Sequence, residues 1–327
     1  MRSVNAAVRI VAVSILMAHA GYAAAQQAYP AKPIRMLVPY PPGGSNNALA
    51  RIVGQKLSES WGQQVVVDNR PGGNTIIGSE ALVKSPPDGY TLMLTSIGAH
   101  AINRVLLPAL PYDSIKDFAP VATVSYSELM LVVPPALPAN TLQEFIALAK
   151  AKPGQLNYAT SGAGSTTHLT AEFFNLLAGV KTQHIPYKGA AGALTDLLGG
   201  QVQMYYSVPI NIVSHVKSGK LKGIAVTGET RVAALPQVPT FTEAGLPGLD
   251  MKSSYGIFAP AAIPKEIVGK LSAEVSKILS VTETREALRA QGMEPFVSTP
   301  EQFAALIKAD IAKFGKIAAA ANIKMEH

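Results

Sequence analysis

The chain has 327 residues, roughly twice the length of an average domain, so we expect two domains. Its composition, 48% hydrophobic and 15% charged, is typical of a folded globular protein and excludes a disordered chain. The sequence has no cysteine, which excludes disulfides, thiolate metal sites and cysteine nucleophiles. Its net charge of +7 comes from scattered residues without a basic run, so no nucleic-acid partner is expected.

The N-terminus has the pattern of a secretory signal peptide. Basic Arg2 and Arg9 precede an apolar run, Ile10–Ala18, that is far shorter than the ~20 residues of a membrane span. The small residues at 23–25 then predict cleavage, so residues 1–25 are a signal peptide and the mature protein is soluble in the periplasm. A buried N-terminal helix is the alternative. Cleavage leaves 26 Lys and Arg against 21 Asp and Glu, a net charge of +5 that favours anionic ligands.

Short β-branched runs then alternate with helical patterns, which indicates βαβ units and mainly parallel sheets. The predicted strands are Ile34–Val38, Val65–Asp68, Thr91–Thr95, Leu129–Val133, Leu156–Thr160, His184–Tyr187, Val202–Ser207, Leu221–Thr227 and Tyr255–Ala259. Apolar residues at helical spacing predict helices at 49–57, from Asn140 to Lys152, at 265–279 and at 301–320.

Two polar segments, Ser125–Leu131 and Asp250–Tyr255, each lead into a strand and are predicted to cross between the domains. Domain 1 would then contain residues 28–126 and 254–327, and domain 2 residues 127–253. A single continuous sheet is the alternative.

Four predicted strands end in loops rich in small residues that open a helix. The loops are PYPPGGSNN at 39–47, SIGAH at 96–100, SGAGSTTH at 161–168 and YKGA at 187–190. Free backbone N–H groups and the positive end of the helix dipole meet at such loops, so each is a candidate anion site. Any one alone fits an ordinary tight turn, but two fall in each domain, which predicts one cleft with donors on both walls. Candidate hydroxyls and neighbouring groups are Ser45, Ser96, Ser161, Ser165, Thr166, Tyr187, Lys188 and Gly189.

The sequence contains only incomplete matches to enzyme motifs. Gly162-Ala163-Gly164 begins like a dinucleotide fingerprint, but Thr167 stands where its third glycine belongs. The SxxK spacing at 214–217 lacks its partner motifs, and the histidines lack metal-binding spacing. His168 is interpreted as a capping or cleft hydrogen-bonding residue. We therefore expect no catalytic residue, metal or cofactor.

Several motifs in order resemble the Bug/TctC family of tripartite tricarboxylate transporter receptors. They are YPAKPIRMLVPYPPGGSNNALAR, VVVDNRPGG, PPDGYTLML, LPYDSIKDFAPVA, LNYATSGAGSTTHLTAEFF, HIPYKGAAGALTDLLGGQVQ and ALPQVPTFTEAGLPG. The resemblance implies an α/β, two-lobed, type II-like periplasmic binding protein fold, each lobe a mainly parallel sheet flanked by helices, that closes like a Venus flytrap. It also implies a bound carboxylate, delivery to small and large membrane subunits, and no catalysis. The site residues that it implies are Gly43, Gly44, Ser45, Asn47, Ser161, Gly162, Ala163, Gly164, Ser165 and His168.

The chain departs from the resembled pattern at two places where the family commonly has acids. Asn47 follows the first glycines, and Ser207 ends the strand after GGQV. Without an acid to pair with an ammonium group, an amino-acid ligand is disfavoured against a dicarboxylate, and the pair Tyr205-Tyr206 favours an aromatic acid. We expect a monomer that binds a small organic carboxylate for uptake. A sensor that signals to a membrane kinase and an enzyme on the same fold are the alternatives.

Overall fold

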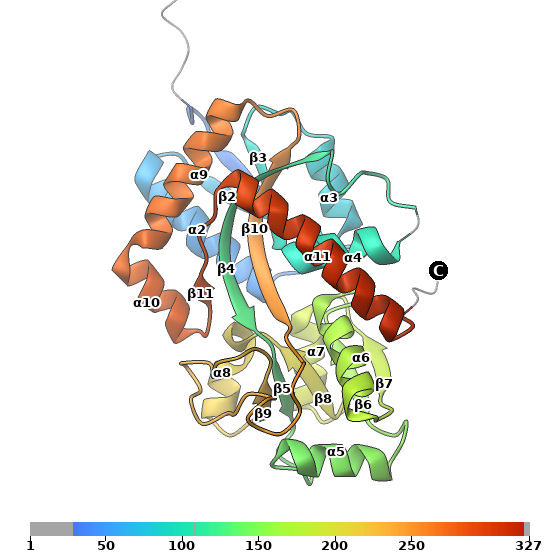
Figure 1. The fold of residues 1–327 in the computed structure, drawn as a ribbon. Helices are drawn as coiled ribbons and strands as arrows, with labels where there is room; N and C mark the ends of the chain where they lie inside the picture. The colour runs from blue at the N-terminus through green and yellow to red at the C-terminus, as the bar shows by residue number, and fades with distance from the viewer. Residues whose placement is uncertain (1–28, 108, 324–327) are drawn as a thin grey trace, which may run out of the picture.

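The computed structural model describes residues 29–107 and 109–323, which form two lobes, each built on one β-sheet flanked by helices (Figure 1). The predicted signal peptide lies outside the described residues. The first lobe contains a six-stranded sheet in the order β11-β4-β10-β3-β1-β2. Its strands are β1 (Ile34–Val38), β2 (Val65–Asn69), β3 (Thr91–Ser96), β4 (Phe118–Glu128), β10 (Lys252–Pro260) and β11 (Glu294–Pro295).

The second lobe contains a five-stranded sheet in the order β7-β6-β8-β5-β9. Its strands are β5 (Met130–Val133), β6 (Asn157–Thr160), β7 (Gln183–Pro186), β8 (Met204–Ser207) and β9 (Lys222–Val226). The first lobe therefore uses both ends of the described chain, and the second is formed by the stretch between them.

Ten helices occur in the described residues, and none of them is long and apolar enough to cross a membrane. Those that follow first-lobe strands are α2 (Ser45–Trp61), α3 (Ile76–Val83), α4 (Ile97–Leu106), α9 (Lys265–Ser280), α10 (Thr282–Ala290) and α11 (Pro300–Ala320). Those between second-lobe strands are α5 (Leu142–Ala151), α6 (Thr166–Ala178), α7 (Ala190–Leu198) and α8 (Pro209–Lys217).

The two-lobed α/β fold is confirmed, but the sheets are mixed rather than mainly parallel. β1 pairs in parallel with β2 and β3, and β6 with β7 and β8. The short β11 pairs antiparallel with β4, and the other antiparallel pairs involve β10 and β5, the strands with which the chain enters a lobe from the other one. Because these strands arrive without a βαβ crossover, nothing forces them to run parallel to their neighbours.

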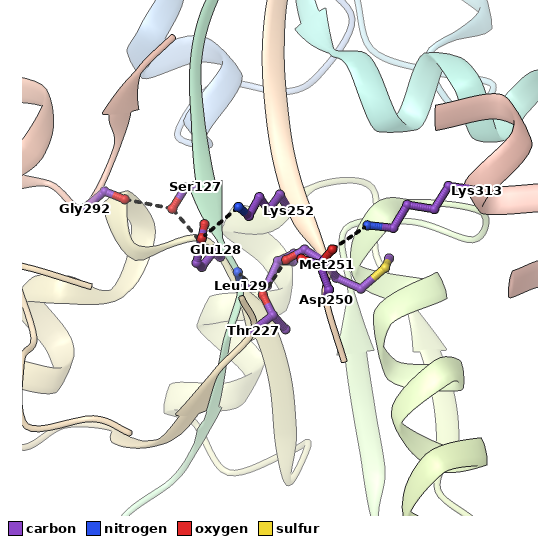
Figure 2. A network of polar contacts seen from close by, with 9 residues as sticks. All are labelled: Ser127, Glu128, Leu129, Thr227, Asp250, Met251, Lys252, Gly292 and Lys313. Atoms are coloured by element: carbon purple, nitrogen blue, oxygen red, sulfur yellow. Dashed lines mark hydrogen bonds and ion pairs between the residues drawn. The ribbon is translucent and has the colours of Figure 1, made fainter. Parts of the chain in front are cut away.

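The two connections between the lobes lie side by side (Figure 2). β4 passes through Leu129 into β5, and β10 pairs antiparallel with β4 from Lys252 opposite Glu128. Leu129 donates its N–H to Oγ1 of Thr227 at 2.8 Å, and the same hydroxyl donates to the carbonyl of Met251. One side chain of the second lobe thus joins both connections.

The C-terminal helix α11 packs against both lobes. Phe303 and Ile307, near its start, belong to a core cluster with first-lobe residues, whereas Phe314 and Ile317 share a cluster with Phe174 of α6. The end of α11 reaches the second lobe in Figure 1 as well. The C-terminal segment predicted for domain 1 therefore also contacts the second lobe, through α11.

Candidate functional site

A cavity of about 180 Å³ lies between the lobes, and five helices begin at its wall. The N-cap residues of these helices all line it: Gly44 (α2), Ser96 (α4), Ser165 (α6), Gly189 (α7) and Val208 (α8). The first N–H groups of a helix have no partner within the helix, and the helix dipole is positive there. The cavity is therefore surrounded by hydrogen-bond donors and partial positive charge.

The free N–H groups concentrate on α2 and α7. Ser96 accepts a hydrogen bond from the N–H of Ala99, and Ser165 accepts one from His168, so α4 and α6 are capped by their own side chains. Gly44, Gly189 and Val208 provide no such cap, but α8 begins with Pro209, which has no N–H, and the N–H of Asn211 already bonds the carbonyl of Val208. The main-chain donors left for a ligand thus come chiefly from one helix in each lobe.

The lobes touch where α2 and α7 begin. An ideal Cβ on Gly43 or Gly44 would lie 3.6 Å from the Cβ of Ala191 or Ala190, respectively. Gly189 has φ 142°, which favours glycine, and a Cβ there would lie 3.2 Å from Pro41 Cδ of the opposite lobe. The lobes are closed on the cavity, and small residues permit that approach.

Three tyrosines contribute neutral hydroxyl groups to the cavity wall. Burial raises the pKa of Tyr40, Tyr205 and Tyr255, so all three remain protonated at neutral pH. The hydroxyl of Tyr255 donates to Ser45 Oγ at 2.9 Å and accepts from Ser253 Oγ at 3.1 Å. Because the single proton of Tyr255 is donated to Ser45, the hydroxyls left to donate to an anion are those of Ser45, Tyr40 and Tyr205, and none of them adds negative charge.

Two polar atoms at the cavity wall are buried without a hydrogen-bond partner in the described chain. They are Asn46 Oδ1 and Thr166 Oγ1, one from each lobe. An unsatisfied buried polar group costs about 1–3 kcal/mol, and such groups are normally paired by protein, water or ligand. Both atoms are therefore candidate ligand contacts that the fold leaves open.

The described part of the cavity wall contains one charged side chain, Lys188, which is exposed at the rim. His168 does not line the cavity. Its Nδ1 accepts from the N–H of Gly164 at 3.1 Å, its ring stacks on His184, and burial lowers its pKa to about 4. A neutral imidazole held in this way supports the loop and is not available as a base for a ligand. No group of three or more potential metal ligands occurs among the described residues.

The structure brings eight of the predicted site residues to this cavity: Gly44, Ser45, Ser96, Ser161, Ser165, Thr166, Lys188 and Gly189. Gly162, Ala163 and Tyr187 instead line a neighbouring hollow. Gly43 lies at the contact between the lobes, and Gly164 donates its N–H to His168. The N–H of Ser161 is likewise taken, by Thr167 Oγ1 at 3.0 Å, so this loop offers fewer free amides than its sequence indicates.

Asn47 and Ser207 are not part of the cavity wall. The amide of Asn47 donates to Asn69 Oδ1 at 2.9 Å and accepts from Arg51 at 3.3 Å, and Asn69 in turn donates to the carbonyl of Tyr40. Ser207 is fully buried and donates to the carbonyl of Val208. Asn47 thus supports the first loop from behind, and neither residue is placed to select against an ammonium group by direct contact.

Sequence reasoning did not identify seven polar residues that line the cavity: Tyr40, Asn46, Thr167, Tyr205, Asn211, Ser253 and Tyr255. Tyr40 and Asn46 lie within a predicted loop, and Tyr205 in the noted tyrosine pair. Its neighbour Tyr206 packs against Phe174 and Phe241 in the core. Ser253 and Tyr255 come from β10, whose return to the cavity is a property of the topology and has no local signal.

Comparison with known proteins agrees with this geometry. The family described as "Tripartite tricarboxylate transporter family receptor" matches residues 49–323. Protein BugT of Bordetella pertussis is 36% identical over 317 residues, covering 96% of this chain and 97% of BugT. A UPF0065 protein from the tcbD-tcbE intergenic region of Pseudomonas sp. strain P51 is 37% identical, covering 89% of this chain and 86% of its own length.

Solved structures are similar as well. An R. palustris protein solved with adipate has a TM-score of 0.88 and 34% identity, covering 90% of this chain and 99% of that protein. MatC from Rhodopseudomonas palustris, with bound malate, has a TM-score of 0.82 and 30% identity, covering 88% of this chain and 99% of MatC.

Proposed function

The chain belongs to the tripartite tricarboxylate transporter receptor family, and from that premise we propose that it captures a small organic carboxylate between its lobes for uptake. Its family and structural neighbours are solute-binding proteins, and the chain is a binding protein rather than an enzyme. The observation that carries the proposal is the set of five helix N-termini around one cavity whose wall contains no carboxylate among the described residues.

The donors are sufficient for an anion without a buried arginine. One helix N-terminus stabilises an anion by about 0.3–1 kcal/mol when exposed and by up to about 2 kcal/mol when partly buried. Several such ends, together with hydroxyls that donate to a charged acceptor, supply a few kcal/mol. Serine and tyrosine hydroxyls from both lobes, among them Ser45, Ser161 and Tyr205, line the cavity for this role.

The cavity size supports a compact acid. A cavity of about 150 Å³ holds a benzene molecule, and the space between the lobes is about 180 Å³. The adipate and malate of the solved neighbours are dicarboxylates. We propose a dicarboxylate or an aromatic acid as the ligand class.

We further propose that the lobes, residues 28–126 with 254–327 and residues 127–253, rotate about the two adjacent connections of Figure 2 to admit and release the ligand. The periplasm is the proposed location and a monomer the proposed state. The proposed partners are the small and large membrane subunits of a tripartite tricarboxylate transporter. Family membership supports these proposals.

A thermal-shift screen followed by calorimetry tests the ligand class, with succinate, malate, adipate and benzoate against aspartate, glutamate and phosphate. Ligand at 100 times its Kd stabilises the protein by about 2.7 kcal/mol. Ser45→Ala should weaken binding several-fold, because Ser45 lines the cavity, whereas Ser60→Ala at the exposed end of the same helix should not. Binding of none of the organic acids would refute the proposal.

A further inference from the structure

A second hollow, of about 580 Å³, adjoins the cavity. The two spaces share Tyr40, Pro41, Ser161 and Lys188, so these residues form the boundary between an inner cavity and an outer compartment. Gly162, Ala163 and Tyr187, which sequence reasoning selected but the inner cavity does not use, line the outer compartment.

The outer compartment is mostly apolar. Pro39, Pro41 and Pro71 contribute ring faces to its wall, and Tyr40 and Tyr187 lie on it as well. No acidic side chain occurs among its described lining residues. Binding sites for small organic molecules commonly combine such apolar walls with a few polar groups that fix orientation.

The first-lobe wall of the outer compartment is held in one conformation. Gly72, Gly73, Asn74 and Thr75 all have positive φ, a conformation that residues other than glycine rarely adopt. The buried Asn103 fixes this segment, since its Nδ2 donates to the carbonyl of Asn74 at 2.8 Å and to Thr75 Oγ1 at 3.1 Å. Strained backbone persists where its surroundings determine it, so the wall is preformed.

The second-lobe wall of the outer compartment is also held in place by contacts within the protein. The hydroxyl of Tyr187 donates to Asp196 Oδ2 at 2.6 Å, and Gly162, with φ 144°, leaves room for both the Tyr187 carbonyl and the side chain of Asn74. A Cβ on Gly162 would lie 3.6 Å from Asn74 Oδ1, which belongs to the opposite lobe. Lobe closure therefore shapes the outer compartment together with the inner cavity.

We infer that the outer compartment receives the distal, largely apolar part of an organic acid whose carboxylate is held by the helix N-termini of the inner cavity. The inference rests on the proposed function. The protein then binds acids with an extended chain or ring in addition to acids that fit the inner cavity alone. Lys188, which makes no hydrogen bond or ion pair with another described residue, lies on the boundary, where it attracts acids entering from either side.

Calorimetry with a short and a long straight-chain dicarboxylate, succinate and suberate, tests the inference. Each buried methylene is worth about fourfold in affinity, so wild-type protein should bind suberate at least as tightly as succinate. Ala163→Phe places a bulky ring on the wall of the outer compartment, where it takes up part of the space, and should lower suberate affinity at least about tenfold while succinate affinity stays within about twofold. Ala163→Ser, of nearly wild-type size, is the matched control and should leave both unchanged.

Equal losses for both acids, or no loss for either, would overturn the inference. If Ala163→Phe does not fold, a crystal structure of the wild-type protein with suberate shows which compartment holds the chain of the ligand. A chain extending between Tyr187 and the segment at 71–75 supports the inference, and a ligand held entirely in the inner cavity overturns it. Succinate binding with suberate excluded leaves the proposed function intact and refutes only the outer compartment, whereas binding of no acid of any length refutes both.

Discussion

Gly98, in the first turn of α4, is placed so that a single methyl group should impair closure. An ideal Cβ at this position would lie 2.7 Å from Thr166 Oγ1 and 3.4 Å from the ring of Phe314. Thr166 opens α6 in the opposite lobe, so the short contact exists only while the lobes are together. Gly98→Ala therefore perturbs the closed arrangement more than the fold of either lobe.

The size of the effect follows from overpacking. An extra methylene in a well-packed site costs about 1–3 kcal/mol. In an open arrangement the same methyl group is free of Thr166, and alanine improves helix propensity over glycine by up to about 1 kcal/mol. Because a ligand enclosed by both lobes binds the closed form, the penalty appears in binding, as a loss of about 5- to 150-fold in affinity.

Calorimetric titration with the acid of the panel that binds most tightly measures ligand affinity. Urea unfolding of the unliganded protein measures the free energy of unfolding. We expect weaker binding with an unchanged or raised free energy of unfolding. Gly269→Ala in α9 is the control, since a Cβ added there would meet no atom of the described chain within 4 Å beyond its chain neighbours and the backbone of its own helix. In a Thr166→Ala background, which removes the colliding hydroxyl, Gly98→Ala should cost less affinity. Wild-type affinity for Gly98→Ala, or a loss of stability as large as the loss of binding, would refute the reasoning.

Thr227→Val leaves the N–H of Leu129 and the carbonyl of Met251 unpaired at the lobe connections, and should lower the free energy of unfolding in urea by about 2–4 kcal/mol. Thr227→Ser keeps the hydroxyl and should retain most of the wild-type free energy of unfolding. A loss below about 1 kcal/mol for the valine variant would contradict this account. Burial raises the pKa of Asp310 to about 6, so the folded form keeps a proton that the unfolded chain loses, and this group's contribution to stability falls as pH rises from about 4 to 6. Asp310→Asn should therefore have a free energy of unfolding in urea that is about 1–3 kcal/mol higher than that of the wild type at pH ~7.5 and equal to it near pH ~4. An equal gain in stability at both pH values would show that the protonation of Asp310 is not the cause.

The sequence predicts most strands because their apolar runs face packed cores. It does not predict a strand whose polar side chains are hydrogen-bonded by residues far away in the sequence. β4 was not predicted, since Thr123, Ser125 and Ser127 give its central part a polar pattern. In the structure Thr123 donates to the carbonyl of Phe296 at 2.6 Å, and Ser127 donates to that of Gly292 at 2.7 Å. Residues more than 160 positions away satisfy these hydroxyls, and local sequence carries no sign of them.

The site was predictable at the level of loops and not at the level of side-chain direction. The small residues before α2 correctly mark a helix N-terminus, but successive residues of a helix are turned by about 100°. Ser45 faces the cavity, and Asn47, two residues further, faces Asn69 on the other side. Residue type at position 47 suggests a direct ligand contact, but Asn47 instead supports the loop through Asn69, which bonds the carbonyl of Tyr40.

The distribution of donors links ligand binding to lobe closure. The N-termini of α2 and α4 belong to one lobe and those of α6, α7 and α8 to the other, so separating the lobes divides the set. At about 0.3–2 kcal/mol for each helix end, either half alone leaves an anion with a fraction of its stabilisation and exposed to water. A ligand shifts a conformational equilibrium only by its difference in affinity for the two states, and here that difference arises from the geometry itself. Main-chain donors are fixed within each lobe and carry no full charge to be desolvated, so closure completes the site at little cost beyond the water that it expels.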